Sequence, residues 1–189
     1  MNAFAILIAL FLSHISAKCM PTSALHNVSH QAREAETCAD PSLATVYVSF
    51  FSISRTAHIL RSRPALVSYD STVANQDNWQ FQNPAFLAWS SLQEFTTPFY
   101  QLISANGDSL DVLPAVNGSP PSVAGFTVQA AVGYAYTTQI CGSVPLLSAV
   151  NAATTDRWWT TNEVEHAELL GSETGWVDGG VSFYVLPLA

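Results

Sequence analysis

The sequence predicts a mainly β protein with short helices, in which three degenerate repeats of about 45–50 residues form a pseudo-threefold, β-trefoil-like single domain. Each repeat begins with a short apolar strand and ends with an aromatic residue that leads into a second apolar strand. The opening strands are expected at 46–50, 98–102 and 145–149, and the closing strands at 79–87, 126–134 and 176–184. A unit of this size cannot bury its own apolar face, so the units 45–95, 97–142 and 144–188 should share one core.

Residues 1–17 have the features of a secretory signal peptide. Residues 4–15 are almost uninterruptedly apolar, and Ser16 and Ala17 supply the small side chains that precede a cleavage site. The run is shorter than the roughly 20 apolar residues that a membrane-spanning helix needs. We therefore expect a soluble, secreted, extracellular chain that begins near Lys18 and has no membrane anchor.

Residues 18–44 read as an N-terminal arm that precedes the repeats, with a short helix expected at 31–37. The arm carries Cys19 and Cys38, and the third cysteine, Cys141, lies near the end of the second unit. Disulfides are typical of secreted proteins, but an odd number of cysteines leaves one without a partner in the chain. Any disulfide should include Cys38, either with Cys19 in a local loop or with Cys141, and of the two we prefer the local pair.

Within the repeats, strand-forming residues alternate with frequent turn signals. The first unit has a long polar stretch at 68–78, and the second has a proline-rich loop in the same place. Only the third unit predicts a helix, at 163–170. Thr161 or Asn162 can cap its start, Glu165 completes the spacing of a capping box with Asn162, and Gly171 ends it.

Composition excludes several classes of partner. The formal net charge is −8, so phosphate backbones and anionic lipids are repelled, and nucleic-acid binding is disfavoured. Two glycosylation sequons begin at Asn27 and Asn117. His26 and His30 have the spacing of a metal-binding helix face, but a solvated arm explains them better. No motif predicts a metal site or a cofactor.

The third unit resembles a secreted repeat family of unknown function that is common in fungi and bacteria. The matching residues are Pro145, Leu146, Leu147, Asn151, Asp156, Arg157, Trp158, Trp159, Thr160, Thr161, Gly175, Trp176, Gly180, Phe183, Tyr184 and Val185. Arg157 stands where the family has a histidine, and only the first unit keeps that residue, at His58. Because domains of this family accompany secreted hydrolases or stand alone, the resemblance implies an accessory or binding role.

One motif points to an enzyme instead. Residues 107–110 spell the Gly-Asp-Ser-Leu nucleophile block of a secreted esterase family, with Ser109 as the nucleophile. Glu163, Glu165 and His166 could supply an acid and a base. However, the block lies in mid-chain before a proline-rich loop, and the repeat alignment explains Asp108 as the counterpart of Asp156.

The tryptophans predict the best binding surface. Alternate residues of a strand face opposite ways, so Trp158 should point into the core, together with Ile59 and Leu110 of the other units. Trp159 should then be exposed beside Arg157 and Thr161, with Asn151 close by. An exposed tryptophan flanked by polar groups is typical of carbohydrate sites, although Trp159 could instead pack beneath a loop.

These observations leave three functions open. The first is a secreted, non-catalytic, lectin-like binding module that binds glycans at Asn151, Arg157, Trp159 and Thr161. The second is a secreted interaction or effector protein that binds an extracellular protein. The third is a small esterase that uses Ser109.

Overall fold

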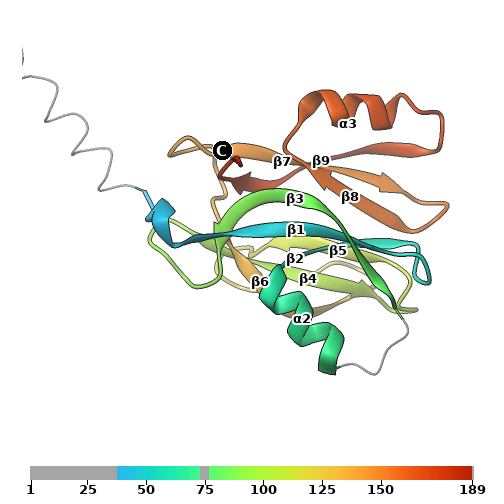
Figure 1. The fold of residues 1–189 in the computed structure, drawn as a ribbon, viewed down its shortest axis with the longest axis horizontal. Helices are drawn as coiled ribbons and strands as arrows, with labels where there is room; N and C mark the ends of the chain where they lie inside the picture. Colours follow the sequence, from blue (N-terminus) through green and yellow to red (C-terminus); the bar gives the residue numbers. More distant parts are fainter. Residues whose placement is uncertain (1–37, 73–76, 189) are drawn as a thin grey trace, which may run out of the picture.

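A computed structural model describes residues 38–72 and 77–188 of the chain (Figure 1). In chain order, the elements are η2 (Pro41–Leu43), β1 (Ala44–Ser52), β2 (Ala57–Ser62), α2 (Arg63–Thr72), β3 (Trp79–Trp89), β4 (Thr97–Ser104), β5 (Leu110–Pro114), β6 (Phe126–Ala135), β7 (Val144–Asn151), β8 (Asp156–Thr160), α3 (Glu163–Leu170) and β9 (Trp176–Val185). The predicted class, mainly β with short helices, is confirmed.

The strands follow one pattern three times along the chain. In each of the predicted units the first strand lies in the middle, and the second and third strands pair with it in antiparallel fashion, as in β2-β1-β3, β5-β4-β6 and β8-β7-β9. The first two units join through β3 and β6 into a six-stranded sheet, whereas the third forms a three-stranded sheet. This division into two sheets does not confirm the β-trefoil-like symmetry.

The irregularities of the sheets also recur. The pairing of the first with the third strand shifts after Tyr47 and after Ser49 in the first unit. The same two shifts follow Phe99 and Gln101 in the second unit, and Leu146 and Ser148 in the third. Because a bulge bends a strand and increases its twist, all three units bend at equivalent places.

Single residue pairs connect the ends of the three closing strands. Trp89 pairs with Tyr134, Tyr136 with Tyr184, and Leu186 with Leu87. Each unit is thereby joined to both of the others.

All three units contribute to one central core. Its buried members are Tyr47, Leu60, Ala85, Phe86, Ala88, Phe99, Val112, Ala135, Leu146, Trp159, Phe183 and Val185. Phe183 stacks on Phe99 and makes an edge contact with Phe86, so aromatic side chains from three units meet here. The shared core that small units require is therefore present.

The predicted orientation of the two tryptophans is wrong. Trp159 is 2% exposed and lies in the central core, whereas Trp158 is only half-buried. The strand register gives the reason: Trp159 lies opposite Ser148, as Leu60 lies opposite Ser49 and Val112 opposite Gln101. The counterpart of Trp159 in the second unit is thus Val112, and an alignment error of one residue there assigned the wrong face.

Ile59 and Leu110 are buried, but they lie in a second cluster rather than beside Trp158. This cluster contains Val48, Phe50, Ala57, Ile59, Leu66 and Leu110. Leu66 comes from α2, a helix that the sequence analysis did not predict. Its serine, threonine and aspartate residues favour turns over helix interiors, and only Pro64 at its start signals a helix.

Helix α3 is confirmed with the predicted bounds. The Asn162 side chain accepts hydrogen bonds from the backbone N–H groups of Val164 and Glu165, and Gly171 follows the last helical residue. Glu165 does not complete the capping box, because its carboxylate accepts a hydrogen bond from Thr160 Oγ1 at 2.7 Å.

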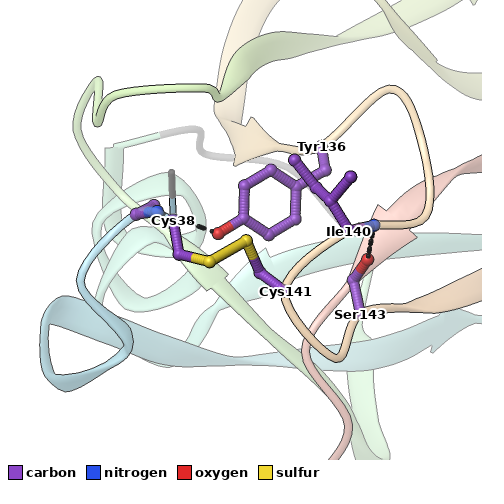
Figure 2. The surroundings of a disulfide bond; sticks show 6 residues. Cys38, Tyr136, Ile140, Cys141 and Ser143 are labelled. Atoms are coloured by element: carbon purple, nitrogen blue, oxygen red, sulfur yellow. Dashed lines mark hydrogen bonds between the residues drawn. A yellow bond between two sulfur atoms is a disulfide. The ribbon is translucent and has the colours of Figure 1, made fainter. Parts of the chain in front are cut away.

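The segment that precedes β1 is held at the end of the molecule where the closing strands of the three units pair (Figure 2). Cys38 and Cys141 form a disulfide across a sequence separation of 103 residues. The Ala39 backbone N–H donates to Tyr136 Oη at 3.0 Å, and Trp89 Nε1 donates to the Asp40 carbonyl at 2.7 Å. The disulfide includes Cys38 as predicted, but the preference for the local pair is wrong. Cys19, Lys18, His26, His30 and Asn27 lie outside the described residues, as do the predicted leader and the helix at 31–37.

Candidate functional site

The turns that follow the first strands of the three units gather at the end of the molecule away from the disulfide. Just after each turn, one residue occupies an equivalent position in each unit. His58 lies opposite Phe51, Leu110 opposite Ile103 and Arg157 opposite Val150. Each of these three side chains contacts a neighbouring unit, so we call them the junction residues.

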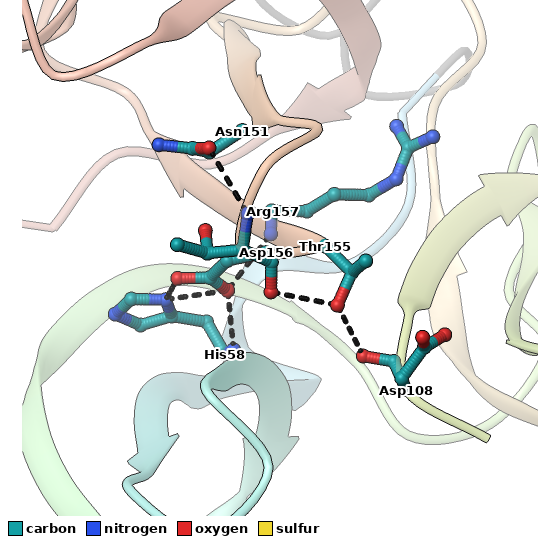
Figure 3. A network of polar contacts seen from close by, with 7 residues as sticks. His58, Asp108, Asn151, Thr155, Asp156 and Arg157 are labelled. Atoms are coloured by element: carbon teal, nitrogen blue, oxygen red, sulfur yellow. Dashed lines mark hydrogen bonds and ion pairs between the residues drawn. The ribbon is translucent and has the colours of Figure 1, made fainter.

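His58 joins the first unit to the third (Figure 3). Its Nδ1 lies 2.9 Å from Asp156 Oδ2 and 3.0 Å from Oδ1. Asp156 Oδ1 also accepts hydrogen bonds from the backbone N–H groups of His58 and Arg157, each at 2.8 Å. Because the carboxylate accepts at Nδ1, a neutral His58 ring carries its proton there and presents an acceptor at Nε2.

Arg157 joins the third unit to the second. Its Nη1 lies 3.2 Å from Asp111 Oδ2. Asp111 is 5% exposed, and burial raises the pKa of its carboxyl, while Arg157 and a hydrogen bond from the Val112 backbone N–H oppose the shift. The ion pair therefore offsets only part of the desolvation of this carboxylate.

Leu110 joins the second unit to the first without any charge. It is 3% exposed and packs in the cluster that contains Ala57, Ile59 and Leu66 of the first unit. The strand register makes Ala57 the counterpart of Asp156. The junction at Leu110 therefore has the methyl group of Ala57 at the position where the junction at His58 has the carboxylate of Asp156.

Further polar contacts tie the turns together. Arg55 pairs with Asp77 at 2.7 Å and donates from Nη1 to the Gly107 carbonyl at 3.0 Å. Thr155 Oγ1 donates to the Asp108 carbonyl at 2.9 Å (Figure 3). These contacts link the first and third units to the turn of the second.

The residues predicted as a carbohydrate site do not form one surface. Trp159 is buried in the core, and Arg157 is held by Asp111. Asn151 is 4% exposed, and its side chain fixes the turn by accepting from the Ala153 and Thr154 backbone N–H groups and donating to the Thr174 carbonyl. Thr161 is half-buried at the start of the segment that leads into α3. Without an exposed Trp159, this site has no aromatic platform.

The residues of the esterase hypothesis are separated. The Ser109 backbone N–H donates to Ser104 Oγ, while His166 Nε2 lies 3.0 Å from the Ser148 carbonyl and 3.6 Å from Asp178 Oδ1. Within the described residues, no hydrogen bond connects Ser109 with His166.

One surface that the sequence analysis missed lies beside the His58 junction. His58, Phe51 and Gln80 form a row across β2, β1 and β3, because Phe51 lies opposite both of the others. The rings of Phe51 and His58 are 4.7 Å apart. Phe51 is half-buried and Gln80 is exposed. His58 is 9% exposed, and within the described part of the chain its Nε2 has no hydrogen-bond partner.

Neither of the other units has this combination in the equivalent row. The second unit has Leu110, Ile103 and Thr127, and the third has Arg157, Val150 and Val177. Only in the first unit does the row present an aromatic ring between two polar side chains. The signal in the sequence was the Phe50–Phe51 pair, in which the strand period sends only one ring into the core.

No group of three or more histidine, cysteine, aspartate or glutamate side chains that could hold a metal ion occurs in 38–72 and 77–188. In the same ranges, no helix combines the length and hydropathy needed to cross a bilayer. Asn117 is exposed in a tight turn between Val116 and Ser119.

Comparison with known proteins identifies a family of domains. Neither a curated protein nor a solved structure is significantly similar to the chain. A family model described as "Domain of unknown function (DUF5648)" matches residues 49–186, which include all of the strands from β2 to β9 and the end of β1. The chain therefore belongs to this family of domains of unknown function.

Proposed function

We propose that this chain is a secreted, non-catalytic binding module that binds a carbohydrate at Phe51, His58 and Gln80. The observation that carries the proposal is the row in which the partly exposed Phe51 ring lies between the exposed Gln80 and His58, which is 9% exposed. Carbohydrate sites combine an apolar platform with a few convergent hydrogen-bonding groups. The row contains groups of both kinds.

Each of the three residues would have a distinct role. The half-exposed ring of Phe51 would pack against the C–H groups of a sugar ring. His58 Nε2 would accept a hydrogen bond from a hydroxyl, because Asp156 holds the proton of the neutral imidazole on Nδ1. The exposed carboxamide of Gln80 can both donate and accept, as vicinal hydroxyls require.

We also infer that the three units are copies of one ancestral unit about a pseudo-threefold axis. The recurring strand order, the bulges at equivalent positions and the pairing between closing strands support this inference. Divergence at the junction positions would then have left a ligand site in one unit only. The disulfide and the apolar leader are compatible with export of the mature chain.

The proposal is tested on an array of defined oligosaccharides, followed by calorimetric titration of the best ligand. Phe51→Ala should weaken binding by at least about tenfold, because the stacked face is lost. Gln80→Ala should weaken it less. Phe81→Ala is the matched control, since Phe81 is also exposed on β3 but lies outside the row.

Thermal unfolding of each variant verifies that the fold is retained. Absence of any ligand on the array, or equal affinity of the wild type and Phe51→Ala for the same glycan, would remove the proposed site.

A further inference from the structure

A second exposed feature lies at the opposite end of the molecule, in the turn that connects β3 to β4 (Figure 1). Leu92 is 65% exposed and Phe95 is 50% exposed. Neither side chain belongs to a buried cluster of the described residues. The turn is nevertheless fixed, because the Gln93 backbone N–H donates to Thr96 Oγ1 at 3.1 Å and the Thr96 N–H donates to the Gln93 carbonyl at 3.2 Å.

The backbone conformation at Phe95 in this turn is unfavourable for a bulky side chain. Phe95 has a φ of 63°, in the left-handed region that bulky side chains rarely adopt. The turn between β6 and β7 is closed by the same pair of hydrogen bonds, between Ile140 and Ser143. There the equivalent residue is Gly142, with a φ of 71°.

A turn closed by these two hydrogen bonds can thus have glycine at this position, although in the β6–β7 turn the preceding Cys141 also has a positive φ, of 57°. Phe95 therefore adds strain, exposes an apolar ring and contributes nothing to a buried cluster. Strained backbone that supports an exposed side chain is a feature of functional sites.

The charges around the turn indicate the charge that a binding partner should carry. Glu94 lies between Leu92 and Phe95, and Asp40 lies on the neighbouring segment, whose carbonyl accepts a hydrogen bond from Trp89. Of the basic residues in the described ranges, Arg55 and Arg157 lie at the opposite end, and Arg61 and Arg63 at the end of β2 and the start of α2. A partner that accepts the two apolar side chains would thus be favoured by positive charge at its rim.

We propose that the turn at residues 92–95 is a docking element that inserts Leu92 and Phe95 into an apolar pocket of a protein partner, rimmed by lysine or arginine. This interaction surface is independent of the carbohydrate site. Its acidic residue disfavours the alternative, insertion into a bilayer, because Glu94 would have to enter the interface with Phe95.

The test uses a defined probe with the same chemistry as the pocket. Amino-substituted β-cyclodextrin offers an apolar cavity with a cationic rim, and unsubstituted β-cyclodextrin offers the cavity alone. In NMR titrations of the full chain, the cationic probe should shift the resonances of Leu92 and Phe95 more than those of the exposed Phe81. Glu94→Gln should weaken its binding about threefold, as loss of one exposed ion pair would.

Phe95→Gly separates this role from a structural one. The variant should lose at least about tenfold in probe affinity and yet unfold at a higher temperature than the wild type, because the left-handed backbone is relieved. Val67→Ser, which alters an exposed apolar residue of α2, should change neither quantity.

Three results would overturn the proposal. They are equal shifts at Phe81 and Phe95, a lower unfolding temperature for Phe95→Gly, and binding to phosphatidylcholine vesicles that depends on Phe95.

Discussion

The junction between the third and first units and the junction between the second and first units use opposite chemistry at equivalent positions. In the former, His58 meets the carboxylate of Asp156. In the latter, Leu110 packs in a cluster with Ala57, the counterpart of Asp156. The fold thus accepts either a hydrogen-bonded pair or apolar contact where two units meet.

This difference bears on how clustered charges should be interpreted. Asp111, Asp156 and Arg157 are ionisable groups gathered within a small volume, as in an active site. Yet their side chains are occupied in joining units, and the equivalent apolar junction joins units without them. Of the groups in this cluster, His58 is the one that lies beside an aromatic ring, that of Phe51.

The largest expected effect comes from removing the carboxylate of the polar junction. Asp156→Ala should lower the free energy of unfolding by about 3–5 kcal/mol, because it leaves a buried imidazole nitrogen and two backbone N–H groups without their acceptor. Urea unfolding followed by tryptophan fluorescence measures the loss. A loss below about 1 kcal/mol would show that water replaces the carboxylate at this junction.

At the apolar junction, Leu110→Ala should cost about 2–4 kcal/mol, since the truncated side chain leaves a cavity in a buried cluster. The same urea titration applies. Val116→Ala, at a residue that is 58% exposed in the same unit, is the control and should have little effect. Equal losses for both variants would contradict the packing role of Leu110.

A double variant can place the side chains of the apolar junction at the polar junction. The double variant His58→Leu and Asp156→Ala recreates the pair of side chains found at Leu110 and Ala57. Its loss of stability should be smaller than the sum of the two single losses by about 1–3 kcal/mol, because the side chains depend on each other. Additive losses would mean that the histidine and the carboxylate act independently.

The smallest effect concerns the pH dependence at the Arg157 junction. Burial raises the pKa of Asp111 above its ordinary value of 3.8, so the folded state takes up this proton more readily than the unfolded state. The contribution of Asp111 to stability therefore increases as the pH falls through the raised pKa towards 3.8, and decreases as the pH rises. Asp111→Asn should remove this slope in chemical denaturation measured from neutral pH down to the ordinary value of 3.8. An unchanged slope would contradict the shift.

The sequence predicted those features of the fold that rest on local signals. Helix α3 has the expected bounds because Asn162 and Gly171 mark its ends with cap residues. The opening and closing strands were recognised from their apolar residues and turn signals. Helix α2 was missed because its turn-favouring composition is overridden by the packing of Leu66 against Ile59.

The candidate site was less predictable, since it depends on register. The choice between Trp158 and Trp159 required an alignment of the second unit that was correct to one residue, and a slip of one residue reverses the face of a strand. The row of Phe51, His58 and Gln80 comes from three strands, so no single stretch of sequence displays it. The pairing of Cys38 with Cys141 likewise depends on how the arm meets the end of the second unit.

The disulfide also determines how the domain would respond to mechanical load. β1 is the central strand of its unit, and only residues 39–43, which include η2, separate it from Cys38. A pulling force applied through the N-terminal segment would enter the molecule at Cys38 and pass through the sulfur atoms to Cys141. The connection between the second and third units would then bear part of the tension, and β1 would be protected from being peeled out of its sheet. Reduction would redirect the full load to β1, so the oxidised chain should resist extension at higher force.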